Sequence, residues 1–200
     1  IYFKYFNSDE YLFEGLNLEI KKDSHTVLTG PNGSGKSTIL GLLAGVFYPN
    51  QGKILANSTK LGFVGPTPLI FSGTLRANLV YGCKDEIKDE EIVKNIKEFK
   101  LFEESKAINL QQKISNKSLS SGQMQKIAFI RALLSEIDTL FLDESTSNLD
   151  EETKNLIFSI LKKKKLTIIN STHDINSFND INEHYKIVIN NGIRSLEKVL

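Results

Sequence analysis

The chain has 200 residues, of which 40% are hydrophobic and 24% are charged, as in an ordinary soluble globular domain. The formal net charge of +1 excludes a global field suited to a nucleic-acid binder, and the single cysteine, Cys83, excludes an internal disulfide. No apolar run reaches the length needed to cross a bilayer. The sequence starts at Ile1 without a methionine, and we expect it to be a piece of a longer chain.

The first third of the sequence alternates strand-like runs with turns. Period-two hydrophobicity predicts half-buried strands over residues 1–6 and 16–20. Residues 27–29 form a short apolar run that enters a glycine-rich turn, and residues 37–43 have the pattern of a following helix. Further strands are predicted over residues 53–55 and 60–64.

The remaining sequence is rich in helical patterns and buried strands. Residues 90–99 and 124–134 have apolar residues at helical spacing, and the stretch 107–118 between them is polar and irregular. We interpret this middle part as a helical insertion. It is followed by an amphipathic helix over 151–161 and by buried strands over 139–142, 166–170 and 186–189. Apolar strands that alternate with helices predict a mainly parallel sheet covered on both faces.

A phosphate-binding loop is predicted over residues 30–37, which fit G-x-x-x-x-G-K-[ST]. Glycines let the backbone wrap closely around phosphate oxygens, and the next helix presents its positive N-terminal end. Lys36 is expected to reach the β- and γ-phosphates, and the Ser37 hydroxyl is expected to ligate Mg²⁺. The alternative is a glycine-rich turn before an ordinary helix. The buried strand before the loop and the helix after it favour nucleotide binding.

A pair of carboxylates, Asp143 and Glu144, ends the buried strand over 139–142. Ligands of α/β sheets bind at the carboxyl ends of the strands, so this pair faces the expected crevice. Asp143 suits Mg²⁺, and Glu144 suits a base that orients the attacking water or accepts its proton. Two carboxylates that begin a solvated loop are the alternative, which is the weaker interpretation beside a phosphate loop.

Residues 119–123, Leu-Ser-Ser-Gly-Gln, resemble the LSGGQ signature of ABC ATPases, with Ser121 in place of the first glycine. A plain helix cap by Ser120 or Ser121 is the alternative. The phosphate loop, the signature and the carboxylate pair follow one another in the family's order. Residues 144–150 look like the family's run from the catalytic glutamate to the D-loop, and His173 stands where the family keeps its switch histidine.

The resemblance implies an α/β fold: a RecA-like P-loop core with a mainly parallel sheet, an N-terminal antiparallel β subdomain and an inserted α-helical subdomain. It implies one ABC ATPase domain over 1–200, with the core in 1–72 and 135–200 and the helical subdomain in 73–134. It also implies ATP and Mg²⁺ as cofactors, and a head-to-tail dimer with a second nucleotide-binding domain around two ATPs.

The same resemblance assigns the site residue by residue. The catalytic residues are Glu144, His173 and Lys36, with a structural role as the alternative for the histidine. Mg²⁺ is assigned to Ser37 and Asp143. The loop residues assigned to nucleotide within one chain are Asn32, Gly33, Ser34, Gly35, Lys36, Ser37 and Thr38. The residues assigned to the nucleotide or the dimer interface across the dimer are Ser120, Gly122, Gln123 and Asp150.

An aromatic residue upstream of the phosphate loop stacks on adenine in this family. Tyr5 has the better spacing, Tyr11 is the runner-up, and core packing is the alternative for both. Residues 69–79 look like the stretch that follows the Q-loop in ABC exporters, which favours an exporter or flippase. We then expect a transmembrane domain fused upstream of Ile1, membrane association through that domain alone, a place on the cytoplasmic side of the cell membrane, and no nucleic-acid partner.

The main departure from the family is Pro66, which stands where the Q-loop glutamine is expected. Proline offers neither a side-chain oxygen nor a backbone N–H. Our hypothesis is that Pro66 stiffens the loop and that a water fills the Mg²⁺ ligand position left by the missing glutamine. The active site would then survive with altered coupling to the membrane domain. Two other functions stay open: a soluble ABC ATPase not tied to transport, and an ATP-binding module with weakened catalysis. The basic run 162–165 is interpreted as a helix C-terminus, with a lipid-headgroup site as the alternative.

Overall fold

The computed structural model describes residues 1–103, 105, 107–147, 149–173, 175, 178, 180–190 and 192–200. Its helices are α1 (Lys36–Leu43), α2 (Leu75–Leu79), α3 (Asp89–Glu98), α4 (Ser121–Leu134) and α5 (Glu151–Lys163). Its strands are β1 (His25–Thr29), β2 (Leu61–Val64), β3 (Gly73–Thr74), β4 (Lys113–Ile114), β5 (Thr139–Asp143), β6 (Thr167–Ser171), β7 (Glu183–Asn190) and β8 (Ile193–Lys198). No helix in this part of the chain is long and apolar enough to span a membrane.

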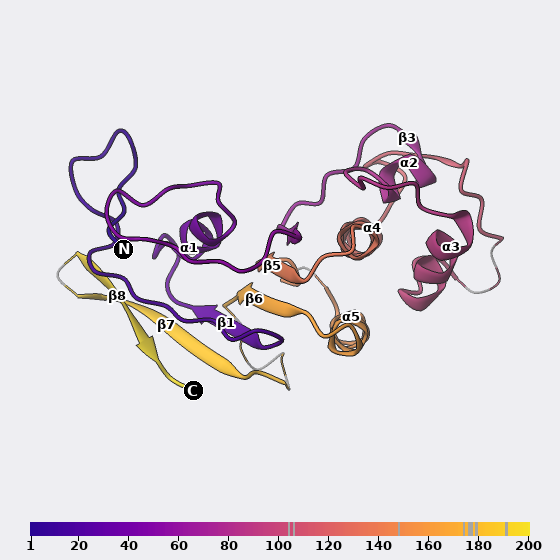
Figure 1. Cartoon of the computed structure of the whole chain (residues 1–200). Helices are drawn as coiled ribbons and strands as arrows, with labels where there is room; N and C mark the ends of the chain where they lie inside the picture. Colours follow the sequence, from indigo (N-terminus) through magenta and orange to yellow (C-terminus); the bar gives the residue numbers. More distant parts are fainter. Residues whose placement is uncertain are drawn as a thin grey trace.

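A six-stranded sheet in the order β2-β5-β6-β1-β7-β8 forms the centre of the domain (Figure 1). The pairs β2–β5, β5–β6, β6–β1 and β1–β7 are parallel, and β8 returns antiparallel to β7. The predicted mainly parallel sheet is confirmed. The order brings the carboxyl ends of β5, β6 and β1 side by side, so the turns that follow these strands meet at one edge.

Alternate residues of the central strands face two separate cores. In β5, Leu140 and Leu142 pack with α4 and α5, whereas Phe141 between them packs with α1. In β6, Ile168 belongs to the core formed with α4 and α5, and Ile169 belongs to the core formed with α1. Each strand is apolar on both sides because helices cover both faces, which explains the continuous apolar runs in the sequence.

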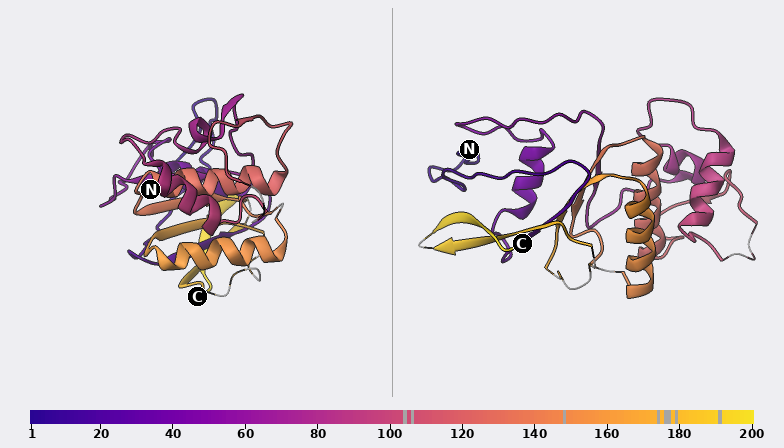
Figure 2. Two further views of the ribbon diagram at one scale, coloured as in Figure 1. Left: turned by 90° about the vertical axis from the view of Figure 1, so that its right-hand side faces the viewer. Right: turned by 60° about the horizontal axis from the view of Figure 1, so that its bottom comes forward.

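Three helices begin at the same edge of the sheet. The helix α1 directly follows β1, and α5 follows β5, so both begin at the carboxyl edge of parallel strands. The helix α4 ends one short turn before β5 begins, so α4 also begins at the carboxyl edge and runs in the same direction as α5. The helices α4 and α5 lie side by side (Figure 2). The positive ends of three helix dipoles thus point toward one edge, which favours the binding of an anion there.

The N-terminal segment contains less antiparallel structure than its hydrophobic pattern predicts. Two isolated antiparallel bridges pair Tyr2 with Gln51 and Phe3 with Phe13. Within the described chain, residues 16–20 and 53–55 form no strand. A strand needs a ladder of hydrogen-bonded neighbours, and at this place Ile1 and Leu16 exchange a single pair of bonds, of 2.7 and 2.9 Å.

The helical part differs from the prediction in its details. The short helix α2 is added, and its N-cap is Thr74, whose side chain accepts a hydrogen bond from the Ala77 N–H. The stretch predicted as irregular contains β4, which pairs with β3. The strand β8 is also added. It forms a hairpin with β7 and closes one side of the sheet.

Candidate active site

The phosphate loop connects β1 to α1 and uses backbone conformations that favour glycine. Gly33 and Gly35 have φ values of 73° and 103°, in the left-handed region. A Cβ atom on Gly35 would lie 2.5 Å from Cζ of Phe13, so a side chain is excluded there by space as well as by conformation. A Cβ atom on Gly33 would meet nothing within 4 Å. The loop is therefore built tightly on one side and open on the other.

Lys36 lies buried beneath this loop. Its Nζ donates to the carbonyl oxygens of Gly30 and Pro31, at 3.1 and 3.2 Å, and lies 3.7 Å from Oε1 of Glu144. The Ser34 hydroxyl is fully buried and has no hydrogen-bond partner among the described residues. A buried polar atom without a partner is expected where a ligand supplies the missing hydrogen bond. This arrangement fits a phosphate group.

The two carboxylates lie where the sequence predicts them, at the end of β5. Oδ1 of Asp143 accepts a hydrogen bond of 2.5 Å from the Ser171 hydroxyl at the end of β6. Glu144 has a φ of 48°, a conformation that is strained for a residue with a Cβ. Its N–H donates to the Ser171 carbonyl at 3.0 Å.

His173 completes the cluster from the turn after β6. Its Nε2 lies 2.7 Å from Oε1 of Glu144 and 3.4 Å from Nζ of Lys36. The three residues are 29 or more positions apart in the sequence, and the strand order β5-β6-β1 brings them together. A carboxylate, an imidazole and an ammonium group therefore meet at the carboxyl edge of the sheet.

Ser37 and Asp143 present oxygen atoms near this cluster. Ser37 is exposed in the first turn of α1, and Asp143 is half-buried. Among the described residues, no group of three or more His, Cys, Asp or Glu side chains could hold a metal ion. Mg²⁺ keeps several waters and combines one or two protein oxygens with phosphate oxygens, so a hydroxyl and one carboxylate fit it.

Tyr5 lies close to the phosphate loop. Its hydroxyl makes a 2.6 Å hydrogen bond with Thr38 Oγ1, and its ring contacts Phe3 and Phe47 edge-on. The side chain is 44% exposed, so one part of the ring is available to a ligand. Tyr11, the runner-up, instead packs edge-on against Tyr2.

The signature residues form the N-terminus of α4. Ser120 is the N-cap: its hydroxyl accepts from the Gln123 N–H at 3.2 Å, and the Gln123 side chain accepts from the Ser120 N–H at 3.0 Å. This reciprocal capping box gives both residues a structural role within the chain. Gly122 is half-buried, and a Cβ there would lie 3.9 Å from Leu149.

Asp150 caps the next helix, α5, at the same edge. Its carboxylate accepts from the N–H and the hydroxyl of Thr153, at 2.8 and 3.0 Å. These hydrogen bonds to the ionised form hold the pKa of Asp150 below its ordinary value. Asp150 is exposed. Asn148, in the same predicted segment, lies outside the described residues.

The residue at the Q-loop position, Pro66, is exposed just after β2. The Gly65 carbonyl before it accepts a 3.1 Å hydrogen bond from the Gln125 side chain of α4. Four residues beyond Gly65, the Leu69 carbonyl accepts from Arg131 at 2.8 Å. We did not identify Gln125 or Arg131 from the sequence. No local sequence pattern marks either residue, because both contacts join α4 to a distant segment.

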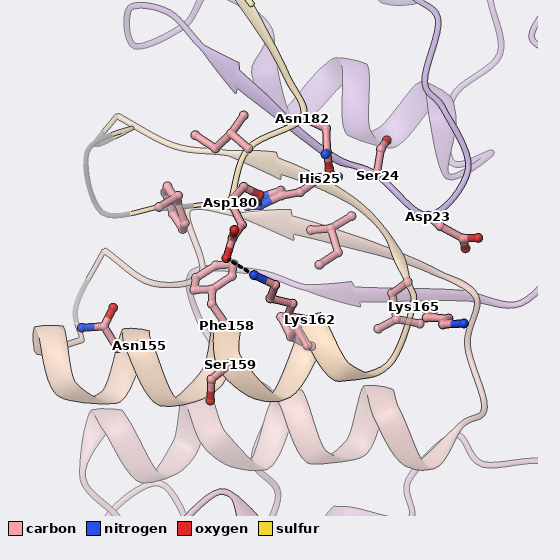
Figure 3. Close-up of a pocket in the computed structure, with 15 residues that line it drawn as sticks. Asp23, Ser24, His25, Asn155, Phe158, Ser159, Lys162, Lys165, Asp180 and Asn182 are labelled. Carbon is pink, nitrogen blue, oxygen red and sulfur yellow. Dashed lines mark hydrogen bonds and ion pairs between the residues drawn. The ribbon is translucent and has the colours of Figure 1, made fainter.

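A second hollow lies at the opposite edge of the sheet, where the strands begin (Figure 3). It measures about 600 Å³ and is lined by His25, Phe158, Lys162 and Asp180, among others. The His25 ring stacks on Phe158 with an interplanar angle of 14°. Burial lowers the pKa of His25 to about 4, so the ring is neutral at pH 7. No residue of the predicted site lines this hollow.

The strand order, the phosphate loop and the acidic strand end define the chain as a P-loop nucleotide-binding domain. A family model described as "ABC transporter" matches residues 13–147. The chain belongs to the ABC transporter family.

Individual relatives support this conclusion. The chain is 34% identical over 187 residues to "ATP-dependent permease MDL1" of Candida albicans, which covers 83% of this chain and 27% of that protein. It is 35% identical over 174 residues to "Lactococcin-A transport/processing ATP-binding protein LcnC" of Lactococcus lactis, with 79% and 24% covered. A solved structure, "Structure of a bacterial Atm1-family ABC exporter with ATP bound", superposes with a TM-score of 0.85 at 25% identity, over 97% of this chain and 36% of that one.

These comparisons confirm the resemblance to the nucleotide-binding domains of ABC exporters. They also show that the chain is similar to a part of each relative. It spans between 13% and 27% of the length of the curated relatives it matches.

Proposed function

We propose that this chain binds and hydrolyses ATP and dimerises head-to-tail around two ATPs to power export or flipping by an ABC transporter. The observation that carries the proposal is the convergence of Lys36, Glu144 and His173 at one sheet edge. The proposal includes a transmembrane domain upstream of Ile1, which would hold this domain at the cytoplasmic face of the membrane. It also keeps the division into a core (1–72, 135–200) and a helical subdomain (73–134).

Each residue has a separate role in the proposed mechanism. Lys36 would leave its carbonyl partners for the β- and γ-phosphates, and the loop amides would bind the phosphate oxygens. Glu144 would orient the attacking water and accept its proton. His173 would contact both Glu144 and the γ-phosphate. Ser37 and Asp143 would hold Mg²⁺, which neutralises charge on the phosphates. Ser120 and Gly122 of the second chain would contact the nucleotide bound by the first chain. Asp150 would lie at the interface between the two chains.

A test of the proposal measures dimerisation and composite-site formation together. Glu144→Gln should form a dimer with ATP and Mg²⁺, observed by light scattering, and should remain a monomer without nucleotide. In this background, Lys36→Ala and Ser120→Arg should each fail to dimerise alone, and their mixture should form dimers through one intact composite site. A Glu144→Gln protein that binds ATP and stays monomeric contradicts the head-to-tail proposal.

Pro66 favours one alternative, an ATP-binding module with weakened catalysis, because no side-chain oxygen is present at that position. The variant Pro66→Gln separates the two functions. If the loop limits turnover, this variant raises ATPase activity or changes the response to the membrane domain. If neither quantity changes, Pro66 does not limit the reaction. An ATPase that is already active with Pro66 in place excludes the weakened module.

A further inference from the structure

The end of β6 contacts both proposed carboxylates through one residue, Ser171. Ser171 is fully buried and is the register partner of Asp143 in the parallel pair β5–β6. Its hydroxyl donates to Oδ1 of Asp143 at 2.5 Å, and its carbonyl accepts from the Glu144 N–H at 3.0 Å. Side chain and backbone of the same residue therefore fix two neighbouring groups on the adjacent strand.

The hydroxyl bond determines how Asp143 presents its oxygens. A carboxylate at the end of a strand rotates about two side-chain torsions, and a donor on one oxygen restricts that rotation. With Oδ1 bound to Ser171, Oδ2 remains for a metal ion. Water does not reach the buried Ser171 hydroxyl to compete for this bond. We therefore expect the bond to be retained when nucleotide and metal bind or leave.

The backbone bond acts on Glu144. Its φ of 48° is unfavourable for a residue with a Cβ, and such a conformation persists only where the surroundings hold it. The Ser171 carbonyl holds the N–H at this strained position. The chain leaves β6 after Ser171 and continues through Thr172 to His173, the partner of Glu144. The end of β6 thus fixes both the direction of Asp143 and the turn that aims Glu144.

We propose that Ser171 is a positioning residue that orients Asp143 for Mg²⁺. The inference rests on the proposed function, because it assumes that Asp143 binds the metal of a metal–nucleotide complex. Hydrogen-bonded partners of metal ligands fix the geometry of those ligands, and their loss costs typically about 10–100-fold in metal affinity. A loss of this size is expected when the Ser171 hydroxyl is removed.

The experiment measures how strongly Mg²⁺ improves nucleotide affinity. A nonhydrolysable ATP analogue is titrated calorimetrically into the protein with Mg²⁺ and again with EDTA, and the ratio of the two dissociation constants is the metal enhancement. In Ser171→Ala we expect the enhancement to fall about 10-fold or more, with the EDTA value unchanged. Ser171→Thr retains the hydroxyl and should restore the enhancement.

A matched control comes from the neighbouring strand. Thr26 in β1 is fully buried, and its hydroxyl has no hydrogen-bond partner among the residues that the structure describes. Thr26→Val removes a buried hydroxyl without touching Asp143 and should retain the full enhancement. Thermal unfolding of each variant reports folding. If Ser171→Ala does not fold, Ser171→Cys, which keeps a similar volume with a weak donor, takes its place and should lower the enhancement.

Each outcome has one meaning. An unchanged enhancement in the folded Ser171 variant overturns the inference. An equal loss of affinity with Mg²⁺ and with EDTA also overturns it, because the residue then has a general structural role. If the parent chain fails to bind the analogue under both conditions, the proposed function itself is wrong.

Discussion

The two edges of the central sheet each hold a histidine, and the two histidines have opposite surroundings. At the carboxyl edge, the His173 side chain is 44% exposed and lies 2.7 Å from the Glu144 carboxylate. At the amino edge, His25 is 8% exposed and its ring packs against both Phe158 and Phe178. The first is available to a ligand, and the second is kept neutral by burial.

The difference extends to the backbone and the helices. The carboxyl edge contains the left-handed Glu144, the glycine loop and the N-termini of α1, α4 and α5. The amino edge receives the C-terminus of α5, whose last turn holds Lys162 and Lys163, as the sequence predicted. Left-handed backbone occurs at both edges, at Glu144 on the first and at Asp23 and Lys165 on the second. The edges differ because helix N-termini surround the first, whereas aromatic rings and exposed charges surround the second. We therefore expect substitutions at the carboxyl edge to change mainly nucleotide binding and turnover, and substitutions at the amino edge to change mainly stability.

The largest effect is expected at the carboxyl edge, from Glu144→Gln. The amide cannot accept the proton of the attacking water, so ATP turnover should fall about 10²–10⁴-fold, the usual contribution of a general base. ATP affinity should stay within about twofold of the parent, because the loop amides and Lys36 are unchanged. Steady-state phosphate release and equilibrium nucleotide binding measure the two quantities.

The matched control for this variant is Glu136→Gln, which removes an exposed carboxylate whose Oε2 lies 3.8 Å from Lys60 Nζ, away from the site. Its turnover should equal that of the parent. Parent-like turnover in Glu144→Gln would remove Glu144 from the mechanism and with it the contrast between the two edges.

The second effect belongs to the amino edge and concerns pH. His25 has a pKa of about 4 when folded and its ordinary value of about 6.5 when unfolded. Between these values the unfolded chain binds a proton that the folded chain excludes. The stability that depends on neutral His25 is therefore complete above pH 6.5 and is lost as the pH falls toward 4, by about 3 kcal/mol.

Urea unfolding of the parent and of His25→Gln at pH 7 and at pH 4 measures this loss. The groups around His25 that also carry charge are Asp180 and Lys162, and they are present in both proteins. The parent should lose about 3 kcal/mol more than the variant over this range. An equal loss in both proteins would mean that His25 is not kept neutral by burial.

Much of the carboxyl edge was predictable because its residues belong to contiguous motifs. Lys36 follows a glycine pattern, Glu144 ends an apolar run, and the signature stands between them, so identity and spacing together predict where these residues lie. The parallel sheet was predictable for a similar reason, since apolar runs alternate with helical patterns. Both predictions use information that lies within a few residues along the chain.

The contacts that fix these motifs were not predictable, because they join residues far apart in sequence. Ser171 reaches Asp143 across 28 positions and Gln125 reaches Gly65 across 60, and both contacts depend on strand register or helix rotation. His25 has no local pattern that marks it as buried, since Phe158 and Phe178 come from distant segments. The N-terminal strands failed for the opposite reason: their local pattern is present, but a ladder of pairing partners is not.

The third effect is a smaller change in stability at the carboxyl edge. It distinguishes the N-cap residue of α4 from the first residue within that helix. Ser120 caps α4, whereas Ser121 is the first residue of that helix and makes no cap. Ser120→Ala should lower the free energy of unfolding by about 1 kcal/mol, the usual cost of a lost N-cap, and Ser121→Ala should change it by much less. Urea unfolding of the two single variants measures the difference. Equal values would show that the capping box does not stabilise α4.

The smallest effect is expected at the amino edge, where Lys162 and Asp180 form a 2.9 Å ion pair beside the hollow. Both side chains are largely exposed, at 68% and 64%, so water and salt screen their attraction. A double-mutant cycle with Lys162→Ala and Asp180→Ala should give a coupling of about 0.2–1 kcal/mol that disappears in high salt. A larger coupling that resists salt would mean that a shielded ion pair stabilises this edge, and the contrast argued from His25 would not hold.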